Sequence, residues 1–327
     1  MVGNRTLNTM GEIMKNGVRL FDTEGNVLHA HGGFMCRVDG WFYWIGENRT
    51  GRVRVSCYRS RDLENWEFRR HILTLDSPKK EYYVRTDTCM ERDVETGTGE
   101  ICFKGCNIER PKVIYNAKTG KYVMWMHYED GGTYREARCA VAACDTIDGE
   151  YTYLGSFRPV GNMSRDCTVF VDDDQTAYFI SAGRENADTI LYRLTEDYLG
   201  IDEQIKVLWP GQFREAAAVC KRNGIYYMIT SDCTGWKPNQ GKYGWAKSLI
   251  GRWSSLKEIG DETTYHSQSA FILPVYTEKG TEYLYVGDRW CAENYADSTY
   301  VFLPLIFEKE HDLRMEYQDE IELGIYH

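Results

Sequence analysis

A short unit that recurs five times along the chain restricts the fold more than any other sequence feature. Each copy begins with a polar residue or glycine, continues as an apolar strand, turns tightly and returns as an aromatic-rich strand. The copies begin at Gly32, Glu109, Asp166, Glu215 and Gln268. Repeats of this kind define the architecture, so they are interpreted before any single element.

Tight turns in two of the copies are typical of β-hairpins. Asp39-Gly40 interrupts the first copy and Asn223-Gly224 the fourth, and such dipeptides favour turns with positive φ at both central residues. Two further strand candidates follow each hairpin, for example residues 53–58 and 66–72 after the first copy. Four antiparallel strands per unit, repeated radially, predict an all-β, five-bladed β-propeller.

The 327 residues are expected to form one catalytic domain, the propeller, over residues 1–327. The stretch between Leu73 and Ile108 is longer than the other connections and predicts an insertion. No apolar leader is visible after Met1, which predicts a cytoplasmic protein, or a secreted one if a leader was removed. The eleven cysteines form no C-x-x-C pair and are read as reduced thiols.

Charge and aromatic content narrow the class of partner. The formal net charge of −10 argues against nucleic acid and anionic membranes, which bind clustered Lys and Arg. Aromatic residues make up 14% of the chain, including 24 tyrosines. Such rings stack on the apolar faces of sugars and also favour β-strands. An oligosaccharide or polysaccharide substrate is therefore expected.

The polar residues that open the repeats are expected to meet in one place. Innermost strands of a propeller surround a single axis, so their equivalent ends converge on one pocket. Two or three carboxylates in an aromatic cleft suit hydrolysis of a glycosidic bond. The alternative is that these residues only cap strand ends.

The sequence resembles glycoside hydrolase family 43, most closely its exo-β-1,3-galactanase group. The resemblance covers nearly the whole chain and depends on the order and spacing of several segments. They are residues 29–33 (HAHGG), 43–48 (YWIGEN), 109–116 (ERPKVIYN), 164–170 (SRDCTVF), 214–218 (REAAA), 234–236 (TGW), Ser267-Gln268 and 287–290 (GDRW).

The resemblance implies roles for the residues that open the repeats. Glu215 matches the general acid of an inverting hydrolase, and Asp166 matches the carboxylate that raises the pKa of that acid and orients it. Most family members have a general-base aspartate in the first blade, where this chain has Gly32 and Gly33. In the galactanase group a fifth-blade glutamine is thought to hold the water, and Gln268 matches it. Glu109 is the other candidate for that role, or a carboxylate that binds sugar hydroxyls.

Further side chains near the strand ends are candidates for substrate binding, and each has a structural alternative. The candidates are Glu47, Asn48, Tyr128, Trp236, Asp288, Arg289 and Trp290. Glu47 and Asn48 could instead stabilise a turn, and the aromatic residues could instead pack in the core. Asp288 and Arg289 could instead pair with each other. No cofactor and no metal ligands are expected. A structural calcium ion on the axis, near His29 and His31, is the exception that stays open.

The leading hypothesis is therefore an inverting exo-glycoside hydrolase that releases galactose from β-1,3-galactan or its oligosaccharides, with Glu215 as general acid. One alternative is an α-L-arabinofuranosidase or another pentosidase of the same family, since a fold does not determine its substrate. The alternative from another class is a carbohydrate-binding propeller without activity.

Overall fold

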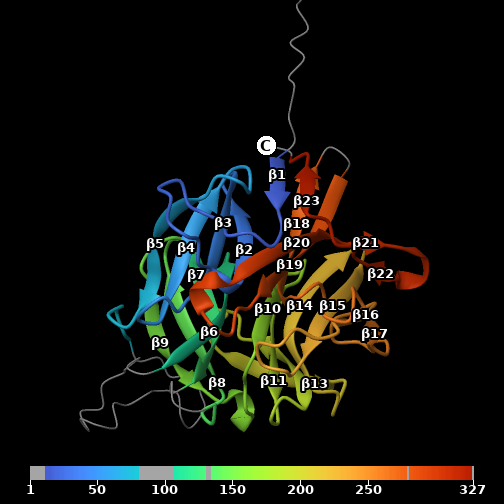
Figure 1. The fold of residues 1–327 in the computed structure, drawn as a ribbon. Coiled ribbons are helices and arrows are strands. Elements are labelled where there is room, and N and C mark those ends of the chain that lie inside the picture. The colour runs from blue at the N-terminus through green and yellow to red at the C-terminus, as the bar shows by residue number, and fades with distance from the viewer. Residues whose placement is uncertain (1–11, 81–105, 130–133, 278–279, 326–327) are drawn as a thin grey trace, which may run out of the picture.

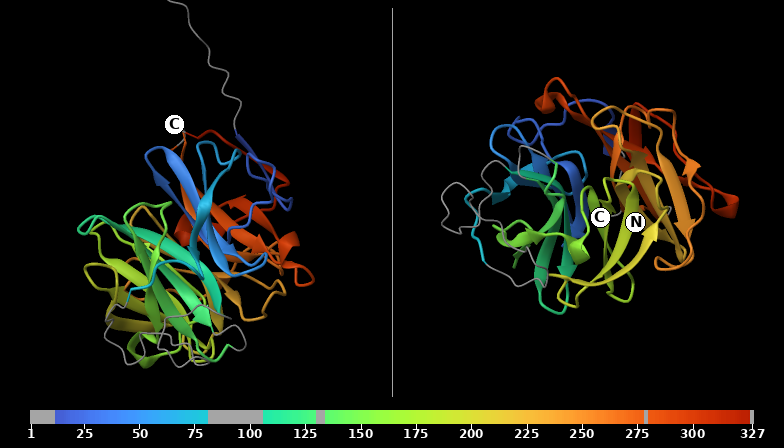
Figure 2. Two further views of the ribbon diagram at one scale, coloured as in Figure 1. Left: turned by 90° about the vertical axis from the view of Figure 1, so that its left-hand side faces the viewer. Right: turned by 90° about the horizontal axis from the view of Figure 1, so that it is seen from below.

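The computed structural model describes residues 12–80, 106–129, 134–277 and 280–325. Short apolar runs separated by tight turns form antiparallel sheets that are arranged radially around one axis, as a five-bladed β-propeller (Figures 1 and 2). The insertion predicted between Leu73 and Ile108 falls largely outside the described residues. The expected hairpin turns are confirmed, with positive φ at Asp39, Gly40, Asn223 and Gly224.

Within the described residues, four of the sheets have four strands in sequence order. The first blade comprises β2 (His31–Val38), β3 (Trp41–Asn48), β4 (Arg54–Ser60) and β5 (Glu67–Thr74). The second comprises β6 (Asn107–Asn116), β7 (Lys121–Glu129), β8 (Arg138–Cys144) and β9 (Thr152–Phe157). The third comprises β10 (Cys167–Val171), β11 (Ala177–Gly183), β12 (Asp188–Leu194) and β13 (Ile201–Leu208). The fourth comprises β14 (Arg214–Arg222), β15 (Ile225–Asp232), β16 (Lys242–Ala246) and β17 (Lys257–Glu258).

The fifth blade differs from the expected four strands, since its sheet has three in the described part of the chain: β18 (Gln268–Thr277), β19 (Gly280–Arg289) and β20 (Thr299–Pro304). β1 (Glu12–Lys15) pairs with β23 (Glu320–Leu323) beside it (Figure 1). The Asn16 side chain bonds both backbone groups of Phe302 in β20, at 2.6 and 2.8 Å. The two ends of the described chain therefore complete the outer edge of this blade.

The remaining elements are small. They are the strand pair β21 (Ile306–Phe307) and β22 (Leu313–Arg314) and the 3-10 turns at Pro159–Gly161, Tyr295–Asp297 and Lys309–His311. No helix in the described residues is long and apolar enough to cross a membrane.

The hydrophobic core lies between the blades. One buried apolar cluster fills each interface between neighbouring blades, including the interface between the fifth and the first. The innermost strands β2, β6, β10, β14 and β18 contact one another in turn, and β18 returns to β2. This packing fixes the starts of the five innermost strands around a common centre.

Candidate active site

A β-bulge of one form, with two residues opposite one, lies near the start of three innermost strands and sets the direction of the side chains there. In β2, β6 and β14 the pairing skips two residues after His31, Glu109 and Glu215. The residue that follows each has positive φ: Gly32 (54°), Arg110 (53°) and Ala216 (53°). By register, His31 and not Gly32 is the first-blade equivalent of Glu109 and Glu215.

Gly32 is favoured by its backbone angle, whereas Gly33 is required by its surroundings. A Cβ atom on Gly33 would lie 2.3 Å from Ile45 O and 2.8 Å from Ala30 O. The innermost strand of the first blade thus offers no carboxylate at this position, and the first-blade carboxylate nearest in register is Glu47 on β3, the partner of His31.

Four strand starts surround a cavity of about 310 Å³. The structure brings together Glu109, Asp166, Glu215 and Gln268, as expected from the repeat. Three of the predicted binding residues, Glu47, Trp236 and Trp290, also line this cavity.

Glu215 has the electrostatic environment that a general acid needs. Burial and the nearby charge of Asp166 raise the pKa of Glu215 to about 7, against the opposing charge of Arg110. Its Oε1 accepts from Gln268 Nε2 at 3.0 Å, and its Oε2 accepts from Asn186 Nδ2 at 3.1 Å. A carboxyl group with this pKa is protonated in a large fraction of molecules near neutral pH.

Asp166 precedes β10 and pairs with a buried guanidinium. Its Oδ2 lies 3.0 Å from Arg110 Nε, and its Oδ1 lies 3.9 Å from His127 Nδ1. Arg110 therefore contacts the carboxylate whose charge raises the pKa of Glu215.

Gln268 uses both ends of its amide. Its Oε1 accepts from Arg110 Nη2 at 2.5 Å and from Trp290 Nε1 at 2.9 Å. Its Nε2 donates to Glu215 Oε1 and to Ser231 Oγ, both at 3.0 Å. Four hydrogen bonds are the full capacity of a primary amide, so every position on Gln268 is occupied.

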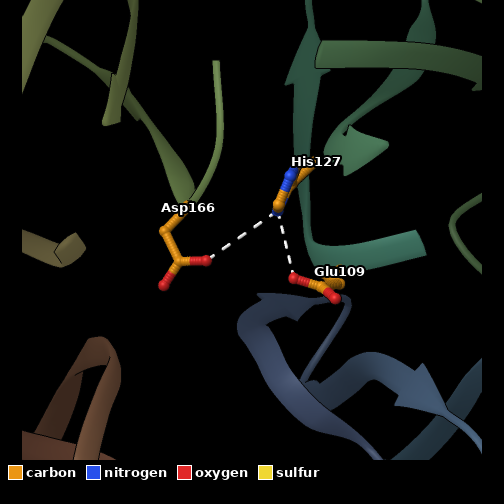
Figure 3. A group of neighbouring side chains, drawn as sticks. All are labelled: Glu109, His127 and Asp166. Atoms are coloured by element: carbon orange, nitrogen blue, oxygen red, sulfur yellow. Dashed lines mark ion pairs between the residues drawn. The ribbon is translucent and has the colours of Figure 1, made fainter. Parts of the chain in front are cut away.

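Glu109 lies within a network of charges (Figure 3). Its Oε1 accepts from Tyr134 at 2.6 Å and lies 2.7 Å from Arg49 Nη2, while Oε2 lies 3.1 Å from His127 Nδ1. Burial alone would raise the pKa of Glu109, but the charges of Arg49 and His127 hold it well below its usual range. Burial opposes the charge on His127, yet the Glu109 charge and the hydrogen bond to Glu129 raise its pKa to about 9.

Glu109, His127 and Asp166 could together hold a metal ion, since one ligand atom from each lies within 4.8 Å of the others (Figure 3). Guanidinium groups already pair with both carboxylates, through Arg49 and Arg110. A cation would have to lie beside these charges, and His127 would have to lose its proton to bind it. We therefore interpret the cluster as an ion-pair network.

Two tryptophans form an aromatic wall of the cavity. Trp236 and Trp290 stack with their ring centroids 5.7 Å apart and their planes 18° apart. Trp290 also donates to Gln268 Oε1. The wall separates the cavity from a neighbouring one of about 230 Å³, which Trp236, Gln268 and Trp290 line as well.

Four predicted binding residues do not line the main cavity. Tyr128 packs in the core between the first two blades, because His127 takes the opposite side of β7. Asn48 bonds Ser56 and closes the turn to Thr50. The remaining two line the neighbouring cavity and do not pair with each other: Asp288 bonds Gly32 N and His31, and Arg289 donates to Tyr265 O.

Several lining residues were not predicted from the sequence. They are Arg49, Arg110, Tyr134, Arg165, Asn186, Cys233 and Gly235. Arg110 follows Glu109 in the ERPK segment, so its place beside a site residue was the one available signal. Asn186 ends a run of three residues with positive φ, 184–186, and nothing in its local sequence indicates its contact with Glu215.

Comparison with known proteins gives a consistent result. The model of glycosyl hydrolases family 43 matches residues 111–270. The chain is 46% identical to an exo-β-1,3-galactanase from Clostridium thermocellum, with a TM-score of 0.86, covering 96% of this chain and 67% of that one. No curated protein sequence matches the chain.

Two other solved structures are similar. A family 43 β-1,3-galactosidase with galactodeoxynojirimycin is 33% identical, with a TM-score of 0.80, over 94% of this chain and 99% of that one. An exo-β-1,3-galactanase from Phanerochaete chrysosporium, with β-1,3-galactotriose, is 34% identical, with a TM-score of 0.81. The match covers 96% of this chain and 69% of that one. The chain thus spans about two thirds of the length of the two galactanases.

Proposed function

Because this chain belongs to glycoside hydrolase family 43 and is a glycoside hydrolase, we propose that it is exo-acting and releases galactose from β-1,3-galactan or its oligosaccharides with inversion of configuration. Relatives more than 30% identical over nearly the whole chain are named for β-1,3-linked galactose. These names support the substrate, and the cavity supports the chemistry.

The observation that carries the proposal is the state of Glu215. Its carboxyl group lies in the cavity with a pKa raised to about 7, while Asp166 lies nearby in an ion pair with Arg110. Two carboxyl groups with different environments are the arrangement that acid-catalysed glycoside hydrolysis requires. In this proposal Glu215 protonates the leaving oxygen, and Asp166 keeps the acid protonated.

The water that attacks the anomeric carbon has to be held on the opposite face of the sugar. We assign Gln268 to positioning this water, which would replace one of the present partners of its amide. Glu109 is assigned to sugar hydroxyls, since its depressed pKa makes it a weak base. Trp236 and Trp290 are assigned to stacking on the sugar ring.

Glu215→Gln tests the proposal, with Glu203→Gln as control on an exposed strand residue far from the cavity. With β-1,3-galactobiose, kcat should fall by about 10²–10⁴-fold in Glu215→Gln and stay unchanged in the control. An aryl β-galactoside with a strongly acidic leaving group needs little protonation, so the variant should retain most of its activity on it. Equal losses on both substrates would refute the role of Glu215.

Two measurements on the unaltered enzyme test the substrate and the stereochemistry. Nitrophenyl glycosides and β-1,3-galactobiose are compared, and cleavage of arabinofuranosides alone would refute the galactan assignment. Proton NMR of the first-formed sugar should give α-galactose from a β-linkage, and β-galactose would refute inversion. Binding of galactan without turnover of any substrate would favour the binding propeller.

A further inference from the structure

Arg110 is a buried guanidinium that connects three innermost strands. It is 5% exposed and lies on β6. Its Nε pairs with Asp166 at 3.0 Å, its Nη2 donates to Gln268 Oε1 at 2.5 Å, and its Nη1 donates to Ser269 O at 2.7 Å. One side chain therefore holds two neighbours of the general acid, Asp166 and Gln268.

The backbone of Arg110 is strained at the place where this contact is made. Its φ of 53° lies in the left-handed region, which is unfavourable for a residue with a Cβ atom. Strain of this kind persists where the surrounding structure enforces it, and it concentrates at functional sites. Here it accompanies a guanidinium whose bonds reach Asp166, Gln268 and Ser269.

The partners of Gln268 determine which end of its amide faces Glu215. Arginine and the tryptophan indole can only donate hydrogen bonds, so the group between Arg110 and Trp290 has to be the amide oxygen. The NH₂ group then faces Glu215 and Ser231. An imidic acid form of Gln268 would direct its hydroxyl proton at two donors, which disfavours that tautomer.

We propose that Arg110 is a positioning residue that keeps Gln268 as an amide donor on Oε1 of Glu215 and thereby fixes the orientation of the carboxyl group that carries the acidic proton. This inference rests on Glu215 being the general acid. The carboxyl group passes its proton to the leaving oxygen as the bond between that oxygen and the anomeric carbon breaks. The water that adds to the anomeric carbon releases a proton to solvent, and Glu215 takes up a proton from solvent before the next turnover.

The guanidinium geometry, and not only its charge, is essential to this arrangement. A lysine at position 110 keeps a positive charge near Asp166 but cannot reach Asp166, Gln268 and Ser269 at once. Misplacement of a catalytic group by about 1 Å can cost about 10²-fold in rate. A loss of turnover with an unchanged charge is therefore the expected signature.

Arg110→Lys is compared with Arg59→Lys as control. Arg59 is a partly buried arginine that bonds Glu67 on the outer strand β5, lies over the Trp41 ring and does not line the cavity. On β-1,3-galactobiose, Arg110→Lys should lose about 100-fold in kcat with KM changed a few-fold, and Arg59→Lys should keep its kcat. Guanidinium ions should restore part of the activity of Arg110→Ala, and ammonium ions should not. Wild-type kcat in Arg110→Lys, or equal rescue by both ions, would overturn the inference.

An NMR measurement on the unaltered protein tests the tautomer even if a variant fails to fold. With ¹⁵N-labelled glutamine, the Gln268 side chain should give two protons on one nitrogen, identified by their loss in Gln268→Glu. A single proton on that nitrogen would overturn the inference. If Glu215→Gln keeps full activity, the proposed function fails; if only the Arg110 or NMR results fail, the general acid stands without this positioning.

Discussion

Glu215 lies on β14 and Asp166 directly precedes the neighbouring innermost strand β10, and the charge of Asp166 is second only to burial in raising the pKa of Glu215 to about 7. The same Asp166 is bound by Arg110. Thus the charge that keeps the acid protonated is itself held in place by a cation. The pH dependence of the reaction therefore depends on Asp166 and on its partner Arg110, although neither residue has to contact the leaving group.

Asp166→Asn should move the alkaline limb of kcat/KM to lower pH. Glu215 acts only when protonated, so activity falls as the pH rises through its pKa, near 7 in the unaltered enzyme. Removing the Asp166 charge lowers this pKa, and the unpaired Arg110 lowers it further. pH–rate profiles on β-1,3-galactobiose check the shift. Asp172→Asn, in the turn between β10 and β11 and paired with Lys221, is the control that should not move the limb. A limb at the same pH in Asp166→Asn would contradict the assignment.

Glu109→Gln should weaken binding more than it slows turnover. Arg49, Tyr134 and His127 all engage this carboxylate, and its pKa is held well below the usual range, so it is ionised but weakly basic. We expect KM for β-1,3-galactobiose to rise about tenfold while kcat changes a few-fold. Added azide, which replaces a missing base, should not increase the rate. A large loss of kcat that azide restores would instead identify Glu109 as the base.

Lys112 should give the stability of the propeller a distinct pH dependence. This lysine is fully buried and donates to Gly32 O at 2.5 Å, and burial lowers its pKa from 10.5 to about 7. Between these values the unfolded chain binds a proton that the folded chain does not, so the contribution of Lys112 to the free energy of unfolding rises with pH. Below pH 7 both states are protonated, and the cost of the buried charge is constant.

Urea unfolding of Lys112→Met at pH 7, 8.5 and 10 checks this dependence. The stability of the unaltered protein relative to the variant should increase across that range. Lys118→Met changes an exposed lysine and should show a constant difference. A constant difference in Lys112→Met as well would mean that the buried amine stays charged.

Much of the architecture was predictable because local sequence patterns determine it. The hairpin turns at Asp39-Gly40 and Asn223-Gly224 and the recurrence of apolar strands define the blades. The convergence of Glu109, Glu215 and Gln268 follows from the repeat alone, since equivalent strand ends meet at the axis.

The contacts between blades could not be predicted in the same way. Arg110 and Asn186 reach the site from backbone with positive φ, and the sequence around each of them does not indicate which contacts that backbone allows. Tyr128 was expected in the pocket because it closes an aromatic strand, but strand alternation gives that side to His127. The spacing of the repeats along the chain indicates which strands meet. The side chains that face the cavity depend on where the β-bulges lie, and the spacing does not show this.

The bulge shared by β2, β6 and β14 has a consequence for how this enzyme can change. The residue before each bulge sits at a place that the backbone defines, whatever its side chain, and His31, Glu109 and Glu215 occupy it in three blades. One or two nucleotide changes at one of these places exchange glutamate, glutamine and histidine without altering the strand. A catalytic role can therefore move from one blade to another during evolution. A propeller that has lost a catalytic side chain in one blade keeps equivalent positions in other blades where such a side chain can arise again.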